Sequence, residues 1–248
     1  MKQKGWLPPK KVSEYLEVNE VLRIIEAVPK ERDKLILRTL WETGGRISEV
    51  LSLTKNNIIT GDNCILLYNL KQSKRKKLLD GTWPPKAPKR LKRIFLSENS
   101  TLMKDLIAFC EKSNVEPDDL VFSGGCRHPD RKGQVSPSYI WKLLSEPYDP
   151  LKGKKGGIAW HLNIRRIKKD KGSEIDTGQE KNKPAWPHIF RHSAAMELLK
   201  RTGRLDVVKE QLGHSTILTT EEYAGLTDRD RKKIVGESKF GNKDGDAL

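Results

Sequence analysis

The chain has 248 residues, enough for one large domain or two small ones, and 48 Lys and Arg against 33 Asp and Glu give it a net charge of +15. This charge disfavours a neutral metabolic enzyme and indicates a polyanionic partner, although composition alone leaves DNA, RNA and an anionic membrane open. No run approaches the roughly 18 to 20 apolar residues of a membrane span, and the N-terminus lacks the apolar core of a secretory signal. We therefore expect a cytoplasmic protein with reduced thiols, in which Cys64 and Cys110 pack in the core.

The N-terminal part predicts a basic arm followed by packed helices. Residues 1–17 are basic and interrupted by two prolines, which indicates a flexible arm. Apolar residues at helical spacing predict a helix over 17–29 and a second one that ends at the glycines 44–45, where a positive φ costs least. A short helix over 47–53 follows, so Arg46 projects from a fixed turn between two helices.

The middle of the chain predicts a small antiparallel sheet with a long cationic connection. Residues 64–68 and 93–96 read as two strands, and 120–122 as a short buried strand. The connection between the first two strands is long for a hairpin, and Asp80 is its one acidic residue. Its basic residues are Lys71, Lys74, Arg75, Lys76, Lys77, Lys86, Lys89, Arg90 and Lys92.

Further helices are expected over 102–110 and after Ser136 or Ser138, either of which could cap the helix. Residues 146–183 form a polar, basic, glycine-rich insertion. We expect one or two short elements around 158–167 and a mobile loop afterwards.

The segment from Pro187 to Tyr223 gathers the residues that point to chemistry. Its first helix places His188 and Arg191 one turn apart, so both can face the same target. A second helix, Leu205 to Leu212, ends at Gly213 just before His214. Thr219 and Glu222 then form a capping box for the helix that carries Tyr223.

Two arginines, two histidines and a tyrosine are sufficient to attack a phosphodiester without a metal. The guanidinium groups of Arg46 and Arg191 match two phosphate oxygens bidentately and stay charged. The phenol of Tyr223, with an ordinary pKa of about 10, needs a neighbour to take its proton. His188 or His214 could take this proton or bind the phosphate, and the residues leave both assignments open.

The pieces TGGRISEVLSL, HIFRHSAAMELL, LGHS and TTEEY resemble the tyrosine recombinases, the phage-integrase group of site-specific DNA recombinases, over residues 18 to 230. The resemblance implies an α+β, mainly α catalytic domain with a small antiparallel β-sheet. It implies cleavage through a 3′-phosphotyrosyl bond that leaves a free 5′-hydroxyl, with no ATP, metal or other cofactor.

The resemblance also implies roles for individual residues. A lysine in a hairpin turn protonates the departing 5′-oxygen; Lys71 fits best, with Lys74, Lys86 and Lys89 left open. Glu49 matches the acidic position that orients the site, one helical turn after Arg46. The cationic loops read as a phosphate-contacting rim, for which the DNA-binding candidates are Lys74, Arg75, Lys76, Lys77, Lys89, Arg90, Arg165 and Arg166.

The implied partner is double-stranded DNA, bound by a homotetramer on two sites, with a monomer or weak oligomer in its absence, nucleoid association and no membrane. Typical members carry a separate N-terminal domain, and since the first motif begins by residue 43, we expect that domain to be absent here. The protein would then be either an enzyme with a catalytic domain only or the C-terminal product of a longer gene. Residues 231–248 are candidates for docking on a neighbouring subunit.

Alternatives remain. A type IB topoisomerase shares the cleavage chemistry, and a DNA-binding relic that inhibits a full-length integrase shares the charge. The run from Leu205 to Tyr223 could also be a helix-turn-helix DNA reader. His188 and His192 have a zinc-binding spacing, but no Cys or Glu completes a ligand set.

Overall fold

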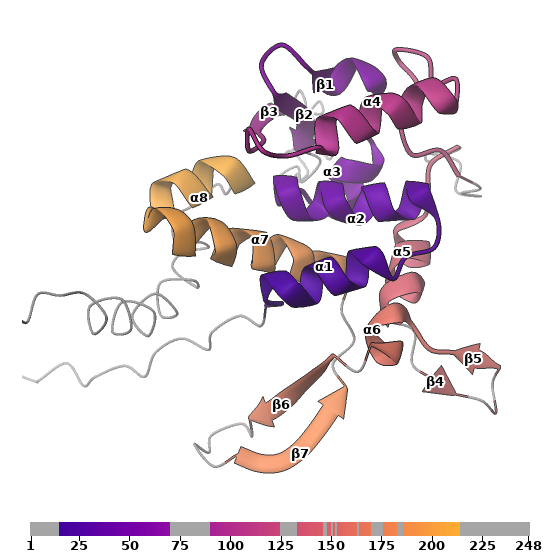
Figure 1. Cartoon of the computed structure of the whole chain (residues 1–248), viewed down its shortest axis with the longest axis vertical. Helices are drawn as coiled ribbons and strands as arrows, with labels where there is room; N and C mark the ends of the chain where they lie inside the picture. Colours follow the sequence, from indigo (N-terminus) through magenta and orange to yellow (C-terminus); the bar gives the residue numbers. More distant parts are fainter. Residues whose placement is uncertain are drawn as a thin grey trace, which may run out of the picture.

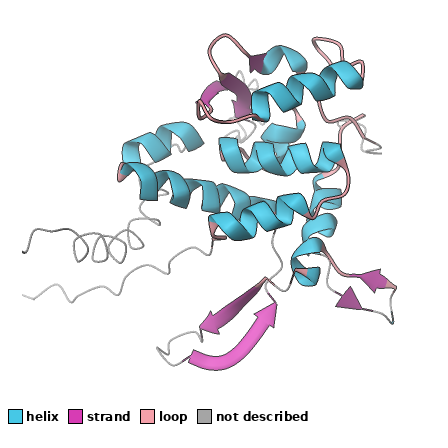
Figure 2. Ribbon diagram, in the orientation of Figure 1, coloured by secondary structure: helices cyan, strands magenta, loops and turns pink. Residues whose placement is uncertain are grey.

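In the computed structural model, helices form most of the body and a small antiparallel sheet lies at one end (Figures 1 and 2). The predicted class, α+β and mainly α, is confirmed. The structure describes residues 15–69, 90–124, 133–145, 148–149, 151, 153–162, 164–169, 176–182 and 186–213.

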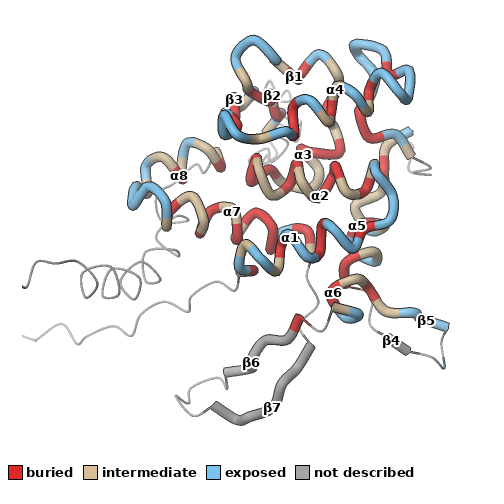
Figure 3. Tube along the Cα trace, viewed as in Figure 1, coloured by how far each residue is buried: buried red, intermediate tan, exposed pale blue. Residues whose placement is uncertain are grey.

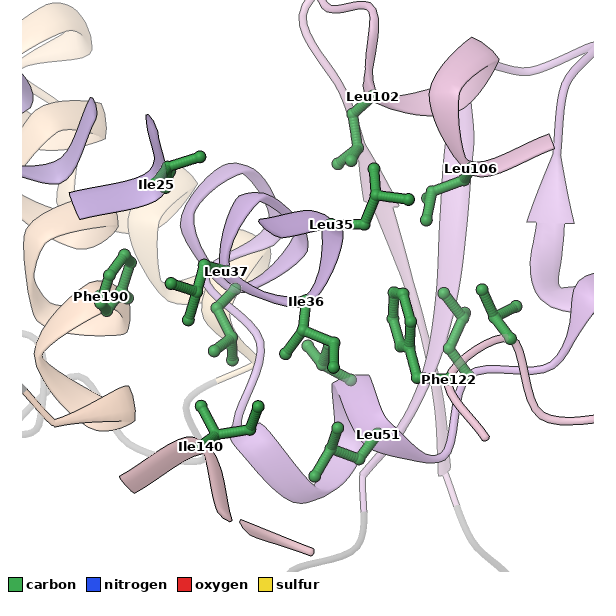
Figure 4. Packing of buried hydrophobic residues seen from close by; sticks show 14 of the residues in the cluster. Ile25, Leu35, Ile36, Leu37, Leu51, Leu102, Leu106, Phe122, Ile140 and Phe190 are labelled. Carbon is green, nitrogen blue, oxygen red and sulfur yellow. The ribbon is translucent and has the colours of Figure 1, made fainter. Parts of the chain in front are cut away.

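Helix α2 (Glu31–Thr43) is the centre of the body. It packs against α1 (Val18–Glu26) and α7 (Pro187–Thr202) on one side and α4 (Leu102–Lys112) on the other (Figure 1). Apolar side chains cover several faces of α2, so it buries more than one stripe. Figure 4 shows some of them against Phe122, Ile140 and Phe190: Leu35, Ile36 and Leu37. Figure 3 shows the buried positions along α2 and α7.

The turn after α2 depends on two glycines for different reasons. Gly44 caps the helix at φ +60°, as predicted, because a left-handed conformation strains any residue with a Cβ. Gly45 does not have a positive φ; a Cβ there would lie 2.7 Å from Cδ1 of Leu67. The next helix, α3 (Ile47–Leu51), is shorter than the predicted 47–53.

The sheet consists of β1 (Ile58–Ile59), β2 (Cys64–Asn69) and β3 (Arg90–Phe95), in that order and antiparallel, after the short 3-10 helix η1 (Lys55–Asn57). Cys64 pairs with Phe95, and Asn69 with Arg90. Both predicted strands are present, each longer than expected. The cationic connection between them, residues 70–89, lies outside the described residues.

The predicted strand at 120–122 is wrong. Leu120 forms an isolated bridge with Thr54, and the chain bends directly afterwards. The apolar run is buried nonetheless: Phe122 has no exposed surface, and the Val121 amide donates to the Leu53 carbonyl at 2.9 Å. Burial by loop packing therefore produced a pattern that resembles a strand.

The insertion contains more regular structure than predicted. After α5 (Pro137–Ser145), preceded by Ser136 as the cap, come the hairpin β4 (Tyr148–Asp149) with β5 (Lys154–Lys155), then α6 (Ile158–His161). The expected mobile loop is wrong in its second part. Strand β7 (Asp176–Asn182) pairs with β6 (Arg165–Lys169), so a second hairpin forms (Figure 1).

The two cysteines expected in the core are there: Cys64 and Cys110 are buried and free. Within the described part of the chain, no helix has both the length and the apolar character that crossing a membrane requires.

Candidate functional site

Arg46 occupies the turn between α2 and α3 and is held there by Glu49. The Arg46 backbone N–H donates to Oε2 of Glu49 at 3.1 Å, and its Nη1 donates to Oε1 at 2.7 Å. The Glu49 side chain is fully buried, whereas that of Arg46 is 22% exposed. The expected contact between the two residues is therefore present, and the guanidinium group of Arg46 keeps access to solvent.

Arg191 lies on α7 and reaches the same turn. Its Nη1 donates to the Gly44 carbonyl at 2.6 Å, and its Nη2 donates to the Leu212 carbonyl at 2.8 Å. The residue is only 2% exposed. Because Gly44 is two residues before Arg46, these bonds bring the two arginines of the distant motifs to the same end of the body.

Lys92, on β3, shares one hydrogen-bond acceptor with each arginine. Its Nζ donates to Oε2 of Glu49 at 2.9 Å and to the Leu212 carbonyl at 3.2 Å. We call Arg46, Glu49, Lys92 and Arg191, with the Leu212 carbonyl, the cation pole. From the sequence alone, Lys92 was only one of many basic residues in a connection. A signal was present: Lys92 is two residues before Ile94 and therefore on the buried face of the strand.

The cation pole shifts the titration of its buried members. Burial alone would raise the pKa of the Glu49 carboxyl, but the charge and hydrogen bond of Lys92, with hydrogen bonds from Arg46, lower it below its ordinary value. Burial lowers the pKa of the Lys92 amine, Glu49 opposes this change, and the charges of Arg191 and Arg46 lower it further. Since Lys92 shares Glu49 with Arg46 and the Leu212 carbonyl with Arg191, three like charges lie close together at the pole.

His188 lies one turn before Arg191 on α7 and is exposed. Its ring meets that of His192 edge to face, with centroids 4.8 Å apart. Among the described residues there is no group of three or more His, Cys, Asp or Glu side chains arranged to hold a metal ion.

The helix α8 (Leu205–Leu212) has both predicted bounds and ends at the pole. Gly213 follows it at φ +64°, and a Cβ there would lie 2.3 Å from Cδ of Lys92. The next residue in the chain is His214. Two side chains of the cation pole therefore donate to the Leu212 carbonyl, two positions before the second candidate histidine in the sequence.

Other candidates lie outside the described residues: Lys71, Lys74, Arg75, Lys76, Lys77, Lys86, Lys89, His214 and Tyr223, with the docking segment 231–248 and most of the 1–17 arm. For Arg90 on β3 and for Arg165 and Arg166 on β6, the structure describes the strand only.

The chain matches the phage integrase family over residues 14–229. It is 26% identical over 229 residues to tyrosine recombinase XerA of Pyrococcus furiosus, covering 92% of this chain and 62% of that protein. It is 30% identical over 231 residues to transposase A from transposon Tn554 of Staphylococcus aureus, covering 90% of this chain and 52% of that protein. The chain thus spans between half and two thirds of the length of these relatives.

Solved structures show the same fold. The crystal structure of XerA recombinase superposes with a TM-score of 0.61 at 19% identity, covering 94% of this chain and 66% of that one. XerH site-specific recombinase, bound to palindromic difH substrate in a post-cleavage complex, gives 0.59 at 17% identity, with 92% and 54% covered. These structures confirm the predicted architecture. The family match over residues 14–229 confirms the family resemblance.

Proposed function

The chain belongs to the phage integrase family of tyrosine recombinases, and from this we propose that it cleaves and rejoins DNA at specific sites through a covalent bond between Tyr223 and a 3′-phosphate. The observation that carries the proposal is the hydrogen bond from Arg191 to the Gly44 carbonyl, at 2.6 Å. It unites the arginines of two motifs that are far apart in the sequence.

The two arginines would take the charge of the phosphate. In the displacement, negative charge grows on the non-bridging oxygens, and guanidinium groups held in advance stabilise it without a metal. Glu49 supports this role because it fixes Arg46 by both carboxylate oxygens. The three cations of the cation pole outnumber its one carboxylate, so the pole itself carries a net positive charge.

The chemistry then needs one bond formed and one broken. The Tyr223 oxygen bonds to phosphorus, the bond from phosphorus to the 5′-oxygen breaks, and the phenol proton passes to His188 or His214. The 5′-oxygen takes a proton from a lysine, for which Lys71 is our candidate. Because the covalent bond retains the energy of the broken one, religation by the 5′-hydroxyl of another strand needs no ATP.

DNA would be held by the basic rim, including Arg165 and Arg166 on β6. We infer that the protein is a monomer or weak oligomer without DNA and forms a homotetramer on two duplexes. We also infer that it associates with the nucleoid and not with a membrane. Native mass spectrometry with and without the captured duplex tests this; a complex with one subunit per duplex would contradict it.

Covalent capture tests the central proposal. A pool of nicked duplexes of random sequence, which cannot religate after cleavage, is incubated with the protein, and DNA linked to protein is recovered after denaturation. We expect the wild type to yield linked DNA whose bound peptide contains Tyr223, and Tyr223→Phe to yield none while it still binds duplex. A wild type without linked DNA would indicate a DNA-binding relic.

The topoisomerase alternative has its own outcome. The sequences recovered from the pool are placed in a supercoiled plasmid in two copies. Exchange of the flanking sequences supports a recombinase, whereas relaxation without any exchange supports a type IB topoisomerase activity.

A further inference from the structure

Lys92 is a partly buried cation that lies between the two halves of the site and has no role in the chemistry above. We propose that Lys92 is a positioning residue that holds the C-terminal end of α8, as far as Gly213, against Glu49, the carboxylate that binds Arg46. The inference rests on the proposed function and names a further residue for it.

Two hydrogen bonds from one ammonium group make this connection. Nζ of Lys92 donates to Glu49 on α3 at 2.9 Å and to the Leu212 carbonyl at the end of α8 at 3.2 Å. The side chain of Lys92 is 10% exposed, so water competes little for these bonds. Motion of the end of α8 away from Glu49 would break at least one of them.

The aliphatic part of Lys92 makes a second connection. It occupies the space beside Gly213, where a Cβ would lie 2.3 Å from Cδ of Lys92. Nearby, Nε2 of Gln211 donates to the Phe95 carbonyl at 3.1 Å. The end of α8 is therefore tied to β3 by two side chains, and only Lys92 also reaches the carboxylate that orients Arg46.

The charges at the pole require a lysine or arginine at this position. Glu49 is fully buried and accepts hydrogen bonds from both Arg46 and Lys92. The partial negative charge of a helix C-terminus also favours cations near Leu212. With Lys92 removed, Arg46 alone would compensate the carboxylate, and the last carbonyl of α8 would keep its bond from Arg191.

Capture kinetics on one nicked duplex taken from the pool test the proposal. We expect Lys92→Met to bind duplex as the wild type does but to form linked DNA about 10- to 100-fold more slowly, because small displacements of catalytic groups have effects of this size. Lys92→Arg, which can donate to both acceptors, should recover much of the rate. Lys104→Met, on the exposed face of α4, is the matched control and should leave the rate unchanged.

A duplex with sulfur in place of the 5′-oxygen separates positioning from proton donation, since a thiolate leaves without a proton. Under our proposal Lys92→Met is as slow, relative to wild type, on this duplex as on the oxygen duplex. Recovery of the wild-type rate would show that Lys92 is the acid, and the proposal would be overturned.

The hydrogen bond between Lys92 and Glu49 is tested by substituting both residues in one variant. If Lys92 acts through Glu49, the double variant Glu49→Gln/Lys92→Met is no slower than the slower single variant; multiplied effects would contradict the bridge. The double variant also removes both buried charges together, so it serves where Lys92→Met alone does not give a cooperative thermal transition.

Amide hydrogen exchange keeps the inference separate from the proposed function. Residues 205–213 should exchange faster in Lys92→Met than in Lys104→Met, whether or not the wild type captures DNA. Unchanged exchange there, or a wild-type capture rate in Lys92→Met, overturns the role of Lys92. Absence of capture by the wild type overturns the recombinase proposal.

Discussion

The cation pole and the insertion at 146–183 are both rich in basic residues, but they differ in how those residues are placed in the fold. At the pole, Arg191 is buried and Lys92 is largely buried, and both donate hydrogen bonds to carbonyls or a carboxylate of other elements. In the insertion, the basic residues that the structure describes lie on the strands of two hairpins that stand away from the helical body (Figure 1). Positive charge held by buried partners suits chemistry that needs fixed geometry, whereas charge on projecting hairpins suits affinity for a polyanion.

Arg191→Met should have the largest effect. It removes the donors to the Gly44 and Leu212 carbonyls, so we expect the free energy of unfolding to fall by about 4 kcal/mol. Covalent capture should fall by roughly 100- to 1000-fold, the usual loss for one preorganised donor. Urea unfolding and capture kinetics measure the two quantities. Arg201→Met, an exposed arginine on the same helix, is the control and should match the wild type.

Glu49→Gln should come next, and its effect should depend on pH. At neutral pH we expect a loss of about 3 kcal/mol, because a buried ion pair is broken. The pKa of Glu49 is lowered in the folded protein, so its carboxylate stabilises above its unfolded pKa of about 4.3, and this stability is lost as pH falls further. The difference between wild type and variant in urea unfolding should therefore shrink below that pH. A difference that stays constant down to acid would contradict the assignment.

Substitution of the glycines that end helices α7 and α8 should reduce stability less than the two changes above, and the two glycines serve as controls for each other. Gly213 and Gly203 have nearly the same φ, +64° and +65°, but a Cβ meets Lys92 only at Gly213 and open space at Gly203. Alanine at either position should destabilise the protein by about 1 to 2 kcal/mol through backbone strain. Only Gly213→Ala should also slow capture. Equal capture rates for the two variants would mean that the contact with Lys92 has no consequence for the site.

The smallest effect on stability is expected in the insertion. Arg165→Gln with Arg166→Gln should change the free energy of unfolding by less than about 0.5 kcal/mol. Duplex affinity should fall regardless of sequence, and the dependence of log K on log salt should become shallower by roughly 1 for each arginine that no longer binds a phosphate. Fluorescence anisotropy at several salt concentrations measures this, with Lys112→Gln on α4 as the control. A changed unfolding midpoint would mean that β6 contributes to the core.

Apolar periodicity and glycine caps in the sequence predicted the helices well, but they did not predict elements that depend on pairing or packing with distant residues. Helix α8 was predicted with both bounds, because Leu205 begins an apolar period and Gly213 supplies the left-handed cap. Strand β7 was missed because its residues are polar throughout and only pairing with β6 makes them a strand. The run at Leu120 was assigned to a strand because burial by loop packing and burial in a sheet select the same residue types.

The site follows the same division. The contact between Arg46 and Glu49 could be predicted because the two residues are one helical turn apart. The bond from Arg191 to Gly44 and the bridge made by Lys92 join elements far apart in the chain. Their partners are set by how α7, α8 and β3 pack, which a single sequence does not display. The roles of Tyr223, His214 and Lys71 stay predictions.

The carbonyl of Leu212 receives both Lys92 and Arg191, and this restricts how the gene can change. One residue inserted into α8 would rotate that carbonyl by roughly 100° about the helix axis and move it along the axis by about 1.5 Å. Neither cation could then reach it. Lengthening the turn of the β6–β7 hairpin would leave every bond at the pole intact. In natural or engineered variants, additions and deletions should therefore accumulate in that hairpin, while the number of residues in α8 stays constant.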